Sequence, residues 1–263
     1  MFKSLMVSVD SSNALASRVR LAVDLAKRYN ARLIGAGAHN FISFPADGLS
    51  AQAVEDLERE GLQQRLDEAE ARFRRLATGN VSCRFDIRAP AIHLAQQARA
   101  ADLLIVGAGT ADYSPMSPDA GDVVMTAGRP VLVVPQNTDH LVAKRIVIAW
   151  KDSRECRRSV QDGLPFLTLA DEIWVASIGS PLDEEGAKDV AEYLNFRGVN
   201  THVFSRPDAA NGVTEELFGL AERSSADLIV AGAYGHSRTR EWIFGGVTQD
   251  LLDKSPVPCL LAH

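Results

Sequence analysis

Short apolar runs alternate along the chain with segments whose apolar residues recur every three or four positions. The apolar runs are rich in Val, Ile and Leu, which is typical of buried strands. They predict strands at Leu5–Val9, Arg32–Ala38, Val81–Ile87, Leu103–Val106, Val131–Val134, Arg145–Trp150, Glu172–Ile178, Thr201–Phe204, Leu228–Ala231 and Cys259–Ala262.

The segments between these runs predict helices. In the first of them, Leu15, Val19, Ala22 and Ala26 share one helix face, and Asn30 predicts a left-handed end. The other predicted helices are Ser50–Thr78, Pro90–Arg99, Ala120–Thr126, Arg154–Leu169, Glu184–Phe196, Val213–Ser224 and Gly246–Lys254. The alternating charges between Glu55 and Arg75 indicate solvated faces of one long helix.

The chain contains an internal repeat. Three pairs of segments recur in the same order and at nearly constant spacing: SLMVSVDSS (Ser4–Ser12) with RIVIAWKDS (Arg145–Ser153), ADLLIVGAG (Ala101–Gly109) with ADLIVAGAYG (Ala226–Gly235), and GRPVLVVP (Gly128–Pro135) with PVPCLLAH (Pro256–His263). Such self-similarity indicates a duplicated unit. We therefore expect two domains, residues 1–135 and 144–263, joined by a short polar segment.

Buried strands separated by helices indicate a parallel sheet covered on both faces. With right-handed crossovers, each half becomes a doubly wound α/β layer. The predicted fold class is therefore α/β, with two flavodoxin-like (Rossmann-like) domains in tandem. Because the connecting segment is short, we expect the halves to pack closely together.

Composition narrows the possible partners and the compartment. A net charge of −6 argues against a general binder of nucleic acid or of a membrane surface, because phosphate-rich partners require a basic face. No apolar run reaches the length of a membrane span, and MFKSLMVSVD is typical of a strand and not of a signal peptide. The 3 cysteines form no C-x-x-C pair. These features favour a cytoplasmic protein with buried, inert thiols.

A glycine-rich loop follows the predicted strand Leu228–Ala231. Gly232 and Gly235 permit positive φ and let backbone N–H groups approach a ligand. Gly245 and Gly246 open a helix whose first N–H groups lack partners and attract anions. In an open parallel sheet this loop emerges at the edge where ligands bind. The pattern suits a polyphosphate, although glycines also serve chain bends.

The loop and the repeat together resemble the universal stress protein family in its tandem, two-domain form. Nucleotide-binding members of that family carry Gly-x2-Gly-x9-Gly followed by Ser or Thr, and Gly232, Gly235 and Gly245 match this spacing. Gly246 occupies the next position, so the expected hydroxyl is missing while the backbone N–H remains. The resemblance covers nearly the whole chain, from the first strand of each half to the last.

The resemblance implies an architecture and a ligand. It implies that Val131–Val134 and Cys259–Ala262 meet as the subunits of single-domain relatives do, which forms an internal pseudo-dimer. It also implies that ATP or a related adenine nucleotide binds in the second half, with Mg²⁺ as a candidate companion of the phosphates. The residues expected to hold the nucleotide are Gly232, Gly235, Gly245, Gly246 and Val247, with Lys151, Arg238 and Arg240 neutralising charge.

The two halves differ at the expected site. The family places an aspartate at the end of the first strand, and that position is Asp10 in the first half but Lys151 in the second. In the first half, Thr110 and Ser117 replace the second and third glycines of the loop. Prolines in this segment remove N–H donors, and its carboxylates repel phosphate. We expect one nucleotide per chain, bound in the second half.

Other functions are weaker alternatives. No Gly-x-Gly-x-x-Gly or Gly-x-Ser-x-Gly motif occurs, and the histidines show no metal-ligand spacing. No catalytic residue and no metal ligand is assigned, and any ATP hydrolysis should be slow because no residue is evidently placed to activate water. One rival is a stress-related interaction protein that binds no nucleotide. Another is a small-molecule site in the first half around Asp10 and His39.

Overall fold

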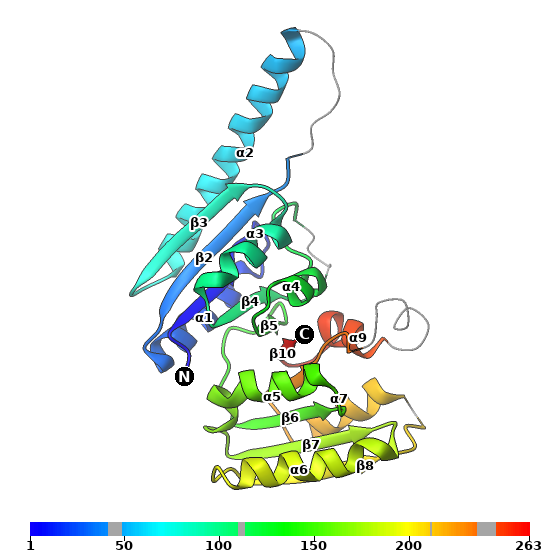
Figure 1. Ribbon diagram of the computed structural model, residues 1–263. Coiled ribbons are helices and arrows are strands. Elements are labelled where there is room, and N and C mark those ends of the chain that lie inside the picture. The colour runs from blue at the N-terminus through cyan, green and yellow to red at the C-terminus, as the bar shows by residue number, and fades with distance from the viewer. Residues whose placement is uncertain (42–48, 110–113, 211, 236–245) are drawn as a thin grey trace.

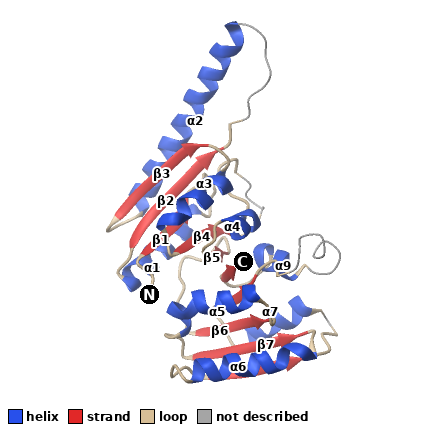
Figure 2. Ribbon diagram, viewed as in Figure 1, coloured by secondary structure: helices blue, strands red, loops and turns tan. Residues whose placement is uncertain are grey.

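The computed structural model describes residues 1–41, 49–109, 114–210, 212–235 and 246–263. These residues form one continuous ten-stranded sheet with helices on both of its faces (Figures 1 and 2). The first half contributes β1 (Ser4–Ser8), β2 (Arg32–His39), β3 (Val81–Ile87), β4 (Leu103–Gly107) and β5 (Val131–Val134). The second contributes β6 (Arg145–Trp150), β7 (Glu172–Ile178), β8 (Thr201–Arg206), β9 (Leu228–Gly232) and β10 (Cys259–Ala262).

The sheet order shows the duplication directly. It reads β3-β2-β1-β4-β5-β10-β9-β6-β7-β8, so the second half repeats the first in mirror order about the β5–β10 junction. Neighbouring strands within each half are parallel, whereas β5 and β10 are antiparallel. The predicted fold class, a doubly wound α/β layer in tandem, is confirmed.

Helices cover both faces of the sheet. On one face, α1 (Leu15–Tyr29), α2 (Leu49–Leu76), α5 (Arg154–Leu167) and α6 (Glu184–Asn195) enclose one apolar core. On the other, α3 (Pro90–Gln97), α4 (Ala120–Thr126), α7 (Val213–Arg223) and α9 (Val247–Asp253) enclose a second. Two short 3₁₀ helices, Ala98–Ala100 and Pro181–Asp183, complete the described helices. Both cores contain residues from both halves, so the two halves share their hydrophobic cores.

Local sequence signals set several helix ends. Asn30 ends α1 with φ 49° and ψ 52°, the left-handed conformation that its sequence predicts. Pro90 occupies the first turn of α3, where its missing N–H costs no hydrogen bond. Ser153 caps α5 by accepting a hydrogen bond from the Cys156 N–H at 3.2 Å. The predicted strand Thr201–Phe204 continues to Arg206.

The repeated Ala-Asp pair has a structural role. The Asp102 carboxylate accepts hydrogen bonds from the backbone N–H groups of Lys3 and Ser4, at 2.7 and 3.0 Å. Asp227 accepts the corresponding bonds from Lys144 and Arg145, at 3.2 and 3.0 Å. Each aspartate thus fixes the start of the first strand of its half beside the fourth.

The junction between the halves is the pairing of β5 with β10. Cys259, Leu260 and Leu261 lie opposite Val133, Leu132 and Val131. All six side chains are buried, so the strands exclude water on both faces of the sheet. The internal pseudo-dimer is confirmed. The C-terminus consequently lies in the middle of the molecule, between the two halves (Figure 1).

One helix departs from the mirror arrangement. The 28 residues of α2 extend well beyond the sheet, whereas α6, in the corresponding place, has 12 (Figure 1). The residues that the first half inserts before its fourth strand therefore lengthen this helix. None of the helices in the described part of the chain has the length and hydrophobicity that crossing a bilayer requires.

We predict that Leu260→Ala lowers the free energy of unfolding by about 2 to 5 kcal/mol, because it leaves a cavity at the junction core. Urea denaturation followed by circular dichroism measures this change. Leu182→Ala is the matched control, since Leu182 is 87% exposed and should change stability little. Equal losses in the two variants would contradict a tightly packed junction.

Candidate functional site

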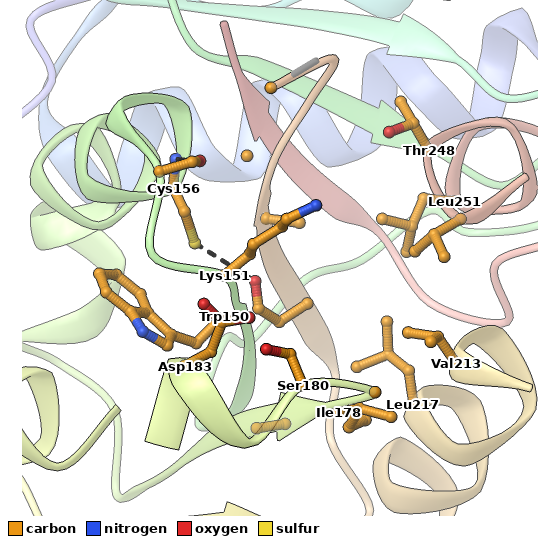
Figure 3. Close-up of a pocket in the computed structure, with 18 of the residues that line it drawn as sticks. Trp150, Lys151, Cys156, Ile178, Ser180, Asp183, Val213, Leu217, Thr248 and Leu251 are labelled. Carbon is orange, nitrogen blue, oxygen red and sulfur yellow. Dashed lines mark hydrogen bonds between the residues drawn. The ribbon is translucent and has the colours of Figure 1, made fainter. Parts of the chain in front are cut away.

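A large cavity lies where the strand order of the second half reverses. The strands β6 and β9 are neighbours there, and their carboxyl ends point to the same edge. The cavity has a volume of about 700 Å³ and opens between the ends of these strands and the helices α7 and α9 (Figure 3). Its size falls within the roughly 300 to 1,000 Å³ common for small-molecule sites.

Apolar side chains form much of the cavity wall. Ile178, at the end of β7, lies near Val213 and Leu217 of α7, and Leu251 of α9 lies beyond them (Figure 3). Trp150 contributes to the wall and is itself buried. These side chains give the cavity a surface suited to a flat, weakly polar group.

The cavity is also lined by a smaller number of polar side chains. Lys151 follows β6 directly, and its side chain extends into the cavity (Figure 3). Asp183 lies at the start of α6, where its carboxylate accepts a hydrogen bond from the Asp152 N–H at 3.0 Å. Ser153, Ser180 and Thr248 add hydroxyl groups. The described lining therefore presents one positive side chain and one negative side chain.

Gly232 is required by packing against α5. A Cβ atom there would lie 2.5 Å from the backbone nitrogen of Cys156 and 2.8 Å from the carbonyl carbon of Glu155, so no larger residue fits. Burial raises the pKa of the Cys156 thiol, and hydrogen bonding from the backbone of Lys151 and Gly232 opposes this rise. The Cys156 Sγ also donates to the Ala149 carbonyl at 3.3 Å. Gly232 thus allows β9 and the start of α5 to approach each other closely.

The left-handed conformation in this loop falls on a residue that the sequence analysis did not single out. Tyr234 has φ 56°, whereas neither Gly232 nor Gly235 has a positive φ. The conformational freedom that these two glycines permit is therefore not used for a positive φ. Gly235 instead allows a close approach, because a Cβ there would lie 3.0 Å from a carboxylate oxygen of Glu155 and 3.4 Å from Ser153 Oγ.

Glu155 is a second acidic residue near the cavity, in addition to Asp183, and lies beside Gly235. Its side chain is 4% exposed and is ion-paired with Arg154, which is largely exposed. Burial raises the pKa of the Glu155 carboxyl, but hydrogen bonds from Arg154, from its own backbone and from Ser153 outweigh burial and hold the pKa below its ordinary value. Glu155 therefore carries a negative charge beside Gly235 at neutral pH.

The remaining predicted site residues divide into two groups. Gly246 is exposed immediately before α9, and Val247, the first residue of α9, lines the cavity with Lys151, Gly232 and Gly235. Gly245, Arg238 and Arg240 lie outside the described residues. The structure thus brings four of the predicted residues together on one cavity wall, while their contact with a ligand stays a prediction.

The part of the cavity contributed by β7 and α7 was not predicted from the sequence. Ser180 and Asp183 follow β7, and Val213 and Leu217 lie on α7. The strand order provides the missing signal, because β7 lies beside β6 and its carboxyl end must reach the same edge. Within the described part of the chain, no group of three His, Cys, Asp or Glu side chains could hold a metal ion.

The corresponding position in the first half is filled. Asp10 and Arg18 form an ion pair at 2.7 Å, and both side chains are nearly fully buried. The Arg18 guanidinium also lies over Gly107, since a Cβ there would be 2.5 Å from its Nη1 atom. The space left between β1 and β4 is only about 30 Å³. Arg18 thus occupies the position that is open in the second half.

Hydrogen bonds complete the Asp10 cluster. The Ser12 hydroxyl donates to Asp10 Oδ1 at 2.6 Å, and the Ser12 backbone N–H donates to the same atom at 3.0 Å. The Ser117 hydroxyl donates to Oδ2 at 3.3 Å. Burial raises the pKa of Asp10, but the charge of Arg18 and the hydrogen bonds from Ser12 and Arg18 outweigh it, and the pKa lies below the ordinary value of 3.8.

The two halves touch beside the larger cavity. Tyr234 lines the cavity, and its hydroxyl reaches α4 of the first half, where a Cβ at Gly121 would lie 2.5 Å from it. The Gly109 N–H donates to the Leu252 carbonyl at 3.1 Å nearby. One wall of the cavity is therefore in direct contact with the opposite half.

Comparison with known proteins finds relatives of both halves. The family model described as the universal stress protein family matches residues 1–135 and 160–263. The solved structure of a universal stress protein from Archaeoglobus fulgidus has a TM-score of 0.66 and 14% identity, and the match covers 98% of this chain and 95% of that chain. A functionally unknown protein from Pseudomonas aeruginosa gives 0.55 at 16% identity, over 99% and 92%. No curated protein matches the chain at comparable significance.

We predict that Asp10→Asn lowers the free energy of unfolding at pH 7 by about 3 to 5 kcal/mol, because it leaves the buried Arg18 charge without its partner. The folded-state pKa of Asp10 is depressed, so its stabilising effect is present above pH 3.8 and is lost as the pH falls through the folded-state pKa. The difference between wild type and variant should shrink in that acidic range. Urea denaturation at a series of pH values measures it.

Asp139→Asn is the control for this comparison. Asp139 pairs with Arg20 at 3.5 Å, but the side chains are 56% and 53% exposed. We expect a loss below about 1 kcal/mol, as is common for exposed pairs. A similar, small loss in both variants would contradict the structural importance of the Asp10–Arg18 pair.

Proposed function

Because the chain belongs to the universal stress protein family, whose domain is present in both halves, we propose that it binds ATP or a related adenine nucleotide in the cavity of the second half. Binding there would act in a stress response as a nucleotide-dependent switch. The stoichiometry would be one nucleotide per chain, since Arg18 fills the corresponding position of the first half.

The observation that carries this proposal is the composition of the 700 Å³ cavity. Its apolar wall, formed by Ile178, Val213 and Leu217, suits the flat base of a nucleotide. Lys151 would neutralise phosphate charge, and the Asp183 carboxylate would accept hydrogen bonds from ribose hydroxyls. Base, sugar and phosphate would thus each meet a chemically matched part of the lining.

Three of the glycines predicted to contact phosphate lie within the described residues. Gly232, Gly235 and Gly246 would offer backbone N–H groups to the phosphates. Gly245, Arg238 and Arg240 would add to these from the segment outside the described residues. Mg²⁺ would be held chiefly by the phosphates themselves, because the described residues offer no cluster of three ligands for it.

The rival function, an interaction protein that binds no nucleotide, is favoured by one observation. The Glu155 carboxylate lies beside Gly235 and would repel a phosphate placed there. Arg154 offsets this charge from the exposed side. Nucleotide binding therefore requires that Arg154 offset the negative charge of Glu155, whereas an uncompensated Glu155 would favour the interaction protein.

We predict that the full-length chain binds ATP saturably with one site, and that Lys151→Ala weakens binding about tenfold or more, the effect expected for loss of one charge-assisted hydrogen bond. Isothermal titration calorimetry at constant ionic strength measures both affinities. Mass spectrometry of the purified protein, run under native conditions, tests for co-purified nucleotide.

Two further variants make the result specific. Lys188→Ala removes an exposed lysine that pairs with Glu184 outside the cavity, and it should bind ATP like the wild type. Gly235→Val should abolish binding, because even a Cβ at this position contacts Glu155. Absence of saturable binding at millimolar ATP in the wild type would favour the interaction protein.

A further inference from the structure

A second cavity lies in the first half, apart from the space that Arg18 fills. Its volume is about 390 Å³, and it is bounded on one side by Asp10 and Ser11 after β1 and by His39 at the end of β2. Residues of α2 form the opposite side. It therefore opens on the α1 and α2 face of the sheet, whereas the cavity of the second half opens toward α7 and α9.

One face of α2 supplies the charged wall. Glu68 and Ala69 lie three and four residues after Arg65, and Arg72 lies four and three residues after them, so all four share one side of the helix. Arg72 is half-buried and donates to the Ser12 carbonyl at 3.1 Å, which fixes this part of α2 over the end of β1. Arg72 thus departs from the expected solvated faces of this helix, whereas Arg65 and Glu68 are exposed as expected.

The strand side of the cavity is polar and rigid. His39 is 7% exposed, and its Nδ1 atom lies 3.0 Å from the Asn40 carbonyl oxygen. In the neutral ring, Nδ1 then carries the hydrogen, and Nε2 is left as an acceptor. The Ser11 hydroxyl is held by a 2.6 Å hydrogen bond with Ser114, which places Pro115 and Met116 over the cavity.

The charges around this cavity do not cancel. Asp10 is neutralised by Arg18 within the buried ion pair, so it contributes no net negative charge to the lining. Arg65 and Arg72 then face the single carboxylate of Glu68. An excess of positive charge in a partly enclosed space favours an anion, and guanidinium groups match carboxylate and phosphate oxygens in geometry.

We propose that this cavity binds a small hydroxylated organic anion, a carboxylate or a phosphate ester. The anionic group would lie against Arg65 and Arg72, and a hydroxyl group would donate to His39 Nε2. Met116 and Ala69, which are 3% and 5% exposed, would contact the carbon skeleton. The volume admits molecules up to about the size of a sugar phosphate and is smaller than that of the nucleotide cavity.

The site is a property of the first half alone. The helix α6, which corresponds to α2, carries a single cation, Lys188, which pairs with Glu184. The proposal therefore does not depend on nucleotide binding in the second half, and each can fail without the other.

Three probes of equal carbon length test it: glycerol 3-phosphate, glycerate and uncharged glycerol. We expect saturable binding of at least one of the two anions to the full-length chain, with a Kd below about 10 mM, and none of glycerol. The anion that binds more tightly shows whether the site prefers a phosphate or a carboxylate group. Calorimetry or ligand-observed NMR gives the affinities.

Variants locate the binding. Arg65→Ala should weaken the favoured anion about tenfold or more, and it should fold normally because Arg65 is exposed on α2. Arg75→Ala, on the same helix but outside the cavity, is the matched control and should bind like the wild type. Lys151→Ala should also leave this binding unchanged, which excludes occupation of the second half. Absence of saturable binding by both anions, or equal binding by wild type and Arg65→Ala, overturns the proposal.

Discussion

The antiparallel pairing of β5 with β10 determines the rest of the structure. Without it, each half would end in a short apolar strand with unpaired backbone groups, a surface prone to nonspecific association. With it, the two parallel layers become one sheet, and both cores continue across the junction. Because β5 and β10 are antiparallel, the strands of the two halves have their carboxyl ends on opposite sides of the sheet, and the two cavities lie on these opposite sides.

Much of the fold could be predicted because its signals are local. Apolar runs marked the strands, and residues such as Asn30 and Pro90 marked helix ends through their own backbone preferences. The partners of Asp10 could not be predicted, because Arg18 reads as one more charge on a helix until that helix is packed beside β4. The packing role of Gly232 could not be predicted for a related reason. Gly232 is needed for contact with α5, which no pattern within the loop reveals.

The two halves keep the same strand arrangement but differ in the residues at the ends of their strands. The aspartates that fix the strand starts, Asp102 and Asp227, are equivalent in both. At the strand ends, by contrast, the first half carries a buried ion pair and a long helix, and the second carries Lys151 and an open cavity of about 700 Å³. The residues that follow the carboxyl ends of the strands can thus differ between the halves, since they contribute little to the shared cores.

Arg18 can be regarded as a permanently attached occupant of the first half. A diffusible ligand stabilises the folded state according to its free concentration, through the logarithm of its ratio to the dissociation constant. A guanidinium tethered to α1 has no such dependence, because it can never be diluted away. The folded state of the first half therefore keeps the stabilisation of the Asp10–Arg18 pair whatever the metabolic state of its surroundings.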